Sequence, residues 1–179
     1  MKTNVNFNIK NIKISPLADN SEISGLNCGE SEIDKYIPRC CDRHSKHRAK
    51  VFCAKDSVSG STIGFYCLSI SAVDSENIKN EFRMHDEYHK YIHFLYLNYL
   101  AVEKAYQCMG VGTFMLVDAL IRCANLANNA GTFGVALNAL TPRAATLYDK
   151  YGFRQFDEHK YPMMILPVQS LFDAVSLLA

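Results

Sequence analysis

The segment that most constrains the fold is a run of apolar residues that passes through a short turn into an amphipathic helix. Residues 94–102 read FLYLNYLAV, which is typical of a central strand covered on both faces. Residues 111–128 follow with apolar side chains three and four positions apart, which predicts a helix of about four to five turns. The order of strand, turn and helix indicates a mixed α+β fold.

Periodicity and turn residues predict further elements on both sides of this unit. Ser31 begins a predicted helix that runs beyond Pro38, where the proline kinks or splits it. The other predicted elements are an opening strand from Phe7 to Ile14 that Pro16 ends, a hairpin of residues 51–54 and 62–70, a polar loop with some helix over 74–90, strands at 133–137 and 153–156, and a helix at 142–151.

Composition predicts one cytoplasmic domain that spans residues 1–179. Hydrophobic residues make up 49% of the chain, no apolar run is long enough to span a membrane, and the start lacks the apolar core of a signal peptide. Seven cysteines, an odd number without a C-x-x-C pair, indicate reduced and mostly buried thiols. With 19 basic and 18 acidic residues, binding to nucleic acid requires a local basic cluster.

The turn before the long helix has the features of an anion site. Gly110 and Gly112 let the backbone approach a ligand closely, and the first N–H groups of the helix favour a negatively charged group such as a pyrophosphate. The alternative is a tight turn that needs glycine for steric reasons alone. The turn lacks the third glycine of a dinucleotide-binding fingerprint and the Gly-Lys-Ser/Thr of a P-loop.

Two motifs resemble the GNAT acetyltransferases. Gln107-x-x-Gly110-x-Gly112 is similar to the pyrophosphate loop of that family, and residues 147–153 (LYDKYGF) resemble its passage from a helix to a strand. The resemblance implies a GNAT fold, in which a central mixed, mostly antiparallel sheet is splayed at the cofactor strand and flanked by helices. It also implies acetyl-CoA as co-substrate and no metal.

Further similarities favour one branch of this family. Residues 26–33 (LNCGESEI) and 63–69 (IGFYCLS) resemble segments of the GNAT toxins of type II toxin–antitoxin modules, and Leu140 lies eight residues before Tyr148. Pro142 stands where many small-molecule acetyltransferases have asparagine. The resemblance implies acetylation of the amino group of aminoacyl-tRNA, a ribbon-helix-helix antitoxin as partner, and a possible homodimer.

The resemblance also implies roles for individual residues. Tyr148 is expected to donate a proton to the departing CoA sulfur; the alternative is a core tyrosine whose hydroxyl is satisfied within the protein. Backbone groups of the strand are expected to pair with pantetheine, and the turn to hold the pyrophosphate. These cofactor-binding residues are Leu100, Ala101, Val102, Gln107, Cys108, Met109, Gly110, Val111, Gly112 and Thr113.

The chain departs from its toxin relatives at two positions. Tyr99 replaces the usual arginine of the cofactor strand, and Cys108 replaces a loop glycine. A cysteine is tolerated at that position only where the backbone has a negative φ. The departures leave acetyl-CoA binding in place, because Gly110 and Gly112 remain, and put RNA affinity or rate in question.

No residue stands out as a general base. Glu103, Asp149 and His159 are each expected to be surface residues. An α-amino group has a pKa of about 7.7 to 8.0, so on the order of a tenth is already neutral at pH 7, whereas a lysine amine is far less so. The missing base therefore favours an α-amine as acetyl acceptor.

One local basic cluster is a candidate tRNA contact. It consists of Arg39, Arg43, Lys46, Arg48 and Lys50, with one acid among twelve residues. The alternative is a solvated helix face. Metal binding by Cys40, Cys41, His44 and His47, or by His85, His89 and His93, is not expected, because adjacent cysteines point apart on a helix and His93 lies in the apolar strand.

Two other functions remain open for the chain. One is a housekeeping N-acetyltransferase that acts on a small amine or a protein N-terminus, which the near-neutral charge permits. The other is a non-catalytic acetyl-CoA-binding module, suggested only by Tyr99 and Cys108.

Overall fold

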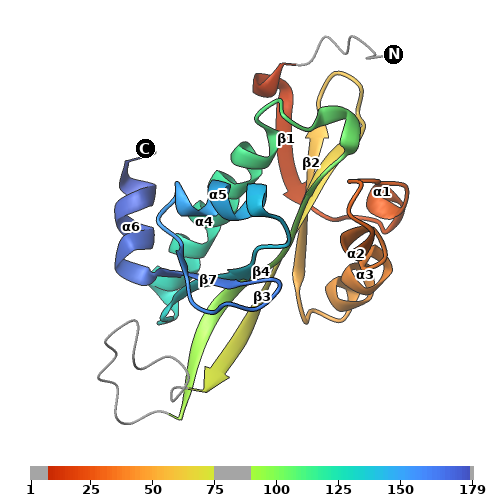
Figure 1. Cartoon of the computed structure of the whole chain (residues 1–179). Coiled ribbons are helices and arrows are strands. Elements are labelled where there is room, and N and C mark those ends of the chain that lie inside the picture. The colour runs from red at the N-terminus through yellow and green to blue at the C-terminus, as the bar shows by residue number, and fades with distance from the viewer. Residues whose placement is uncertain (1–7, 75–89, 178–179) are drawn as a thin grey trace. The chain divides into compact units, whose positions relative to one another are not determined.

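The computed structural model describes residues 8–74 and 90–177 (Figure 1). Phe7 and the histidines at 85 and 89 lie outside these residues, as does almost all of the predicted polar loop. All seven cysteines are described, and all are free thiols; Cys108 is exposed and the other six are buried, as the sequence predicts. Among the described residues, no helix is both long enough and apolar enough to cross a membrane.

The strands form a seven-stranded mixed sheet with the order β1-β2-β3-β4-β5-β7-β6. β4 and β5 are parallel, whereas β1 pairs with β2, and β7 with both β5 and β6, in antiparallel fashion. The predicted mixed, mostly antiparallel sheet is thus confirmed. The strands are β1 (Ile12–Pro16), β2 (Lys50–Asp56), β3 (Thr62–Asp74), β4 (Tyr91–Val102), β5 (Gly134–Asn138), β6 (Arg154–Gln155) and β7 (Met163–Pro167).

Helices connect and flank these strands (Figure 1). They are α1 (Ser21–Ser24), α2 (Ser31–Asp34), α3 (Ile37–Ser45), α4 (Val111–Asn129), α5 (Pro142–Asp149) and α6 (Val168–Ser176), with the 3-10 turns η1 (Ile9–Asn11) and η3 (Lys104–Tyr106).

The chain divides into two compact units, the first of which comprises Met1–Cys67 and Tyr99–Leu116. In this unit α3 packs on β2, and Cys40 and Val51 are fully buried. Gly64 in β3 lets Ala101 and Met115 approach the β3 backbone closely, because a Cβ there would lie 2.7 Å from the Ala101 carbonyl oxygen and 2.8 Å from the Met115 sulfur. The end of β4 and the start of α4 are thereby pressed onto β3, which fixes the turn between them.

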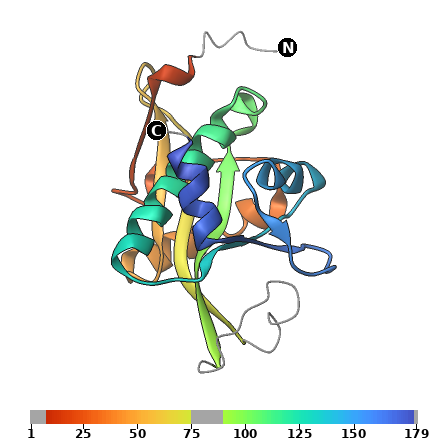
Figure 2. The same cartoon turned by 90° about the vertical axis from the view of Figure 1, so that its left-hand side faces the viewer.

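The second unit comprises Leu68–Asn98 and Val117–Ala179. Its core contains Ile92, Phe94, Ala136 and Ile165, from three neighbouring strands. The helix α6 packs against β5 and β7 and is seen most clearly in Figure 2. Burial of these side chains removes apolar surface from water, which is the main stabilising contribution to this half of the sheet.

Several boundaries differ from those predicted. The predicted helix from Ser31 is split in two near Pro38, which is one of the two outcomes expected there: α2 ends at Asp34 and α3 begins at Ile37, with Pro38 in its first turn, where proline is well suited. The opening strand starts only at Ile12, because the Asn8 side chain accepts a hydrogen bond from the Lys10 N–H and holds a 3-10 turn. β7 and α6 were not predicted.

Candidate acetyl-CoA site

The last residues of β4 extend beyond the pairing with β5. The parallel register runs from Phe94 opposite Gly134 to Leu97 opposite Leu137, whereas β4 continues to Val102. A strand whose neighbour has turned away leaves backbone groups open to another extended molecule, as in β-augmentation. This is the splay that the resemblance implied, and it includes Leu100, Ala101 and Val102.

The turn between β4 and α4 is tied to residues 27 and 28. The side-chain amide of Gln107 donates hydrogen bonds to the carbonyl oxygens of Cys28, at 2.7 Å, and Val102, at 3.0 Å. The carboxylate of Glu103 accepts from the Asn27 N–H at 2.8 Å, and the Lys104 N–H donates to the Asn27 carbonyl at 3.0 Å. The Gln107 side chain therefore holds the turn in shape, and the backbone of Gln107 is the part left to contact a ligand.

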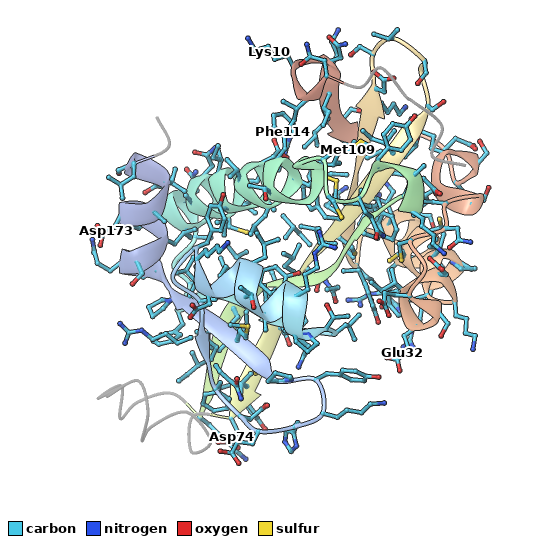
Figure 3. The ribbon with its side chains drawn as sticks, turned by 45° about the horizontal axis from the view of Figure 1, so that its top comes forward. Lys10, Glu32, Asp74, Met109, Phe114 and Asp173 are labelled. Carbon is cyan, nitrogen blue, oxygen red and sulfur yellow. The ribbon has the colours of Figure 1, made fainter. Side chains whose placement is uncertain are left out.

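Two residues of the turn have left-handed backbone conformations. Gly110 has a φ of 85° and Cys108 a φ of 64°. The expectation of a negative φ at Cys108 is therefore wrong: the chain keeps the backbone shape suited to glycine and places a side chain on it. This conformation is unfavourable for residues with a Cβ by about 1–2 kcal/mol. Met109, between them, is 40% exposed, and Phe114 beyond the turn is 37% exposed. Both side chains are labelled in Figure 3.

The two glycines of the motif serve different purposes. Gly110 suits the backbone shape, because its φ is positive and a Cβ would also lie 3.0 Å from the end of the Ile9 side chain. At Gly112 a Cβ would lie 3.6 Å from the Val102 side chain and 3.9 Å from that of Leu100, which are ordinary contact distances. The steric explanation thus accounts for Gly110 and leaves Gly112 available for close approach of a ligand.

The first turn of α4 supplies the donors of an anion site. The first hydrogen bond of the helix runs from the Phe114 N–H to the Gly110 carbonyl at 3.0 Å, and the first turn contains no acidic residue. The N–H groups that precede Phe114, up to that of Thr113, have no partner within the helix, and they lie at the positive end of its dipole. The turn is therefore suited to hold a pyrophosphate.

Tyr148 lies near the end of α5 and is only 7% exposed. The helix begins at Pro142, capped by the Thr141 hydroxyl, which accepts from the Ala144 N–H at 3.2 Å. The ring of Phe153 lies 5.7 Å from that of Tyr148. Burial raises the pKa of Tyr148 to about 12. Within residues 8–74 and 90–177 its hydroxyl forms no hydrogen bond.

The basic cluster is divided among three kinds of structure. Arg39 and Arg43 lie on α3, Lys46 and Arg48 in the following turn, and Lys50 at the start of β2, so the cluster is not one helix face. Arg43 is half-buried and donates to the Tyr36 hydroxyl at 3.0 Å and to the Arg48 carbonyl at 3.5 Å. The other four are exposed; Lys46 pairs with Asp42 at 2.6 Å on the surface.

Sequence reasoning missed one residue of this region. Tyr36 lies against Tyr99 with ring centroids 4.1 Å apart, and the guanidinium carbon of Arg39 lies 5.6 Å from the centre of the Tyr36 ring. Tyr36, Arg39 and Arg43 follow at spacings of three and four, which place side chains on one helix face. That spacing could have indicated from the sequence that Tyr36 lies beside the two arginines.

The three residues considered as general base, and the candidate metal ligands, have other surroundings in the described part of the chain. The carboxylate of Glu103 is used by Asn27, and Asp149 and His159 are exposed. No three described His, Cys, Asp or Glu side chains gather closely enough to hold a metal ion. Cys40 and Cys41 are buried, and His44 accepts a hydrogen bond from the Val51 N–H at 3.0 Å.

Curated relatives include a probable toxin and a tRNA-acetylating toxin, each from a bacterium. The chain is 25% identical over 168 residues to a Sinorhizobium fredii protein described as "Probable toxin TacT", covering 88% of this chain and 92% of the relative. It is also 25% identical over 153 residues to the tRNA-acetylating toxin of Mycobacterium tuberculosis, covering 84% of this chain and 89% of the relative.

Solved structures share the fold. AtaT complexed with acetyl-methionyl-tRNAfMet superimposes with a TM-score of 0.76 at 19% identity, covering 93% of this chain and 98% of AtaT. A mutant AtaT toxin bound to acetyl-CoA and the C-terminus of the antitoxin AtaR gives a TM-score of 0.71 at 17% identity, covering 90% and 96%. The model of the acetyltransferase (GNAT) domain matches residues 47–155, which include the end of β4, the turn before α4 and Tyr148. The chain belongs to the GNAT family of acetyltransferases.

Proposed function

We propose that this chain transfers the acetyl group of acetyl-CoA to the amino group of aminoacyl-tRNA and acts as the toxin of a toxin–antitoxin pair. The observation that carries the proposal is the splayed end of β4 leading into an anion-binding turn whose Gly112 the fold does not require. Two similar proteins support aminoacyl-tRNA as the acetyl acceptor, since one is a tRNA-acetylating toxin and another was solved with acetylated methionyl-tRNA.

The cofactor is held by backbone groups. Residues 100–102 pair with the pantetheine amides as an added strand would, and the N–H groups of residues 107–113 bind the pyrophosphate. The side chains of Leu100 and Val102 support the turn from beneath Gly112. Because Gln107, Glu103 and Lys104 fix the turn before any ligand arrives, little conformational entropy is lost on binding.

In the reaction, the neutral α-amine attacks the thioester carbonyl carbon, and the C–S bond breaks as the tetrahedral intermediate collapses. The amine nitrogen loses one proton to solvent and the departing thiolate takes one from solvent, so no net proton is consumed. Tyr148, with a pKa of about 12, stays protonated and donates a hydrogen bond to the thiolate. A thiol has a pKa of about 8.5, so complete transfer of the phenolic proton is unfavourable and the hydrogen bond is the main contribution.

The exposed cations contact the tRNA. Arg39, Lys46, Arg48 and Lys50 are all exposed, and the closely spaced Lys46, Arg48 and Lys50 suit contacts to neighbouring phosphates. Arg43 is partly engaged within the protein, and its contribution is to orient Tyr36. Both compact units belong to one GNAT domain of residues 1–179 that acts in the cytoplasm without a metal, binds a ribbon-helix-helix antitoxin and forms a homodimer.

The test is to supply purified protein with labelled acetyl-CoA and, in separate reactions, charged tRNA, deacylated tRNA, free amines and peptides. Label on charged tRNA and none on deacylated tRNA is the expected result. Label on peptides or polyamines and none on charged tRNA would replace the proposal with the housekeeping acetyltransferase. Acetyl-CoA binding without transfer to any acceptor would favour the non-catalytic module.

A further inference from the structure

We propose that Tyr36 and Arg39, supported by Tyr99, form a stacking site for an unpaired nucleobase at the 3′ end of the acceptor RNA. The inference rests on the proposed function for the identity of the RNA. The three side chains lie in the same compact unit, Tyr36 immediately before α3, Arg39 in its first turn and Tyr99 near the end of β4.

The geometry is that of a partly open stack. The rings of Tyr36 and Tyr99 are 4.1 Å apart and tilted by 35°, and the guanidinium of exposed Arg39 lies over the Tyr36 ring at 5.6 Å. A planar base between ring and guanidinium needs about 7 Å, because each stacking contact takes about 3.5 Å. Arg39 need retreat by only about 1.5 Å to admit it, which a long exposed side chain does readily.

The Tyr36 ring is held in place before any ligand binds. Its hydroxyl accepts a hydrogen bond from Arg43 at 3.0 Å, and half-buried Tyr99 packs against its ring. A fixed aromatic face binds a planar group with little further loss of conformational entropy. Arg43 and Tyr99 are thus positioning residues, whereas Tyr36 and Arg39 contact the base.

The surroundings specify the class of ligand. Aromatic faces and guanidinium planes bind nucleobases, and the nearby cations Lys46, Arg48 and Lys50 suit the phosphates that join them. Bases of a duplex are stacked on one another and cannot present their faces, so the ligand is single-stranded. Tyr99 directly precedes Leu100, whose backbone we assign to pantetheine, and a strand advances only about 3.3 Å per residue. A base held here is close to the end that carries the amino acid.

The probe is an uncharged RNA minihelix with a single-stranded CCA end in which 2-aminopurine replaces the terminal adenine. Stacking quenches its fluorescence, so one titration gives both affinity and stacking. Tyr36→Leu removes the ring, and Tyr36→Phe keeps the ring but removes the hydroxyl. Arg39→Lys keeps the charge without the plane. Acetyl-CoA affinity, measured on every variant, reports whether the first unit remains folded.

We expect Tyr36→Leu to abolish the quenching and weaken minihelix binding by a factor of about 5 to 150, the range for one stacked base. The salt dependence should not change, because no phosphate contact is lost. Tyr36→Phe should keep most of the affinity and quenching, because it keeps the ring and loses only the Arg43 hydrogen bond that helps to position it. Arg39→Lys should lose part of the quenching.

Unchanged quenching and affinity in Tyr36→Leu would overturn the inference, as would an equal loss in Tyr36→Phe, which would assign the effect to the hydroxyl. Because the probe carries no amino acid, its binding is independent of acetyl transfer. A wild type that quenches the probe but does not label charged tRNA would refute the proposed function and leave the stacking site standing. If Tyr36→Leu loses acetyl-CoA binding as well, the first unit is no longer folded in it and the test passes to Arg39→Lys, which changes an exposed side chain. Unchanged quenching in Arg39→Lys would then overturn the inference.

Discussion

Replacing Cys108 with glycine should stabilise the folded chain. The residue has a φ of 64°, where a side chain is unfavourable by about 1–2 kcal/mol. Glycine removes that strain but gives the unfolded chain more freedom, which offsets about 0.5–1 kcal/mol. The net gain lies between about 0 and 1.5 kcal/mol, and its middle value of about 0.75 kcal/mol raises the Tm of a chain of this length by about 1.5–3 °C.

Thermal unfolding followed by circular dichroism in a reducing buffer measures this gain. Cys108→Ala is the matched control, because it removes the thiol and any contact the sulfur makes but keeps a Cβ at the same φ. The difference in Tm between the glycine and alanine variants therefore isolates the backbone strain. If both variants melt at the same temperature, the reasoning from φ fails. Acetyl-CoA affinity should be unchanged in both, since neither obstructs Gly112.

Four further predictions concern the cofactor, the reaction, the RNA and pH. Gly112→Val should fold but lose acetyl-CoA affinity by calorimetry, with Gly112→Ala in between; wild-type affinity in the folded valine variant would remove the anion site from the turn. Tyr148→Phe should keep acetyl-CoA affinity and lower turnover by a factor on the order of ten to a thousand; an equal rate in the variant would make Tyr148 structural. The wild-type rate should not fall between pH 7 and 10, because Tyr148 has a pKa of about 12 and remains protonated there. Changing Lys46, Arg48 and Lys50 together to glutamine should weaken tRNA binding and flatten its salt dependence by roughly one unit per lost contact, leaving acetyl-CoA affinity intact; an unchanged slope would mean that these cations face solvent only. Burial lowers the pKa of His44, so below about pH 6.5 the unfolded chain is protonated at His44 before the folded chain is, and the free energy of unfolding falls as the pH drops. In denaturant unfolding, His44→Gln should lose less of its free energy of unfolding over that range than the wild type does. An identical loss in the variant would mean that other groups cause the acid sensitivity.

The parts of the fold that sequence predicted best are those in which local pattern and tertiary environment agree. The β4–turn–α4 unit was predictable because an apolar strand, glycines and helical spacing all indicate the same geometry. β7 lacked such a signal, because MMILP is a short apolar run without alternation and becomes a strand only by pairing between β5 and β6.

Within the site, backbone features were predictable and side-chain contacts were not. The glycine pattern located the turn, whereas the role of Gln107 depends on Cys28, which lies 79 residues away in the chain. The apolar spacing over residues 111–128 includes Phe114, yet that side chain is 37% exposed, because at the start of this helix the buried face is formed by Val111 and Met115. Such assignments depend on which neighbours tertiary folding brings, and no local pattern contains that information.

The hydrogen bonds between the turn and residues 27–28 also determine when the acetyl-CoA site can form during synthesis of the chain. Asn27 and Cys28 emerge from the ribosome long before Glu103 and Gln107, their partners across 76 and 79 residues. Closing contacts of such separation is slow compared with forming local turns and helices. A nascent chain that ends before Gln107 therefore has no finished cradle for acetyl-CoA, and the enzyme becomes competent only after most of its length has been translated.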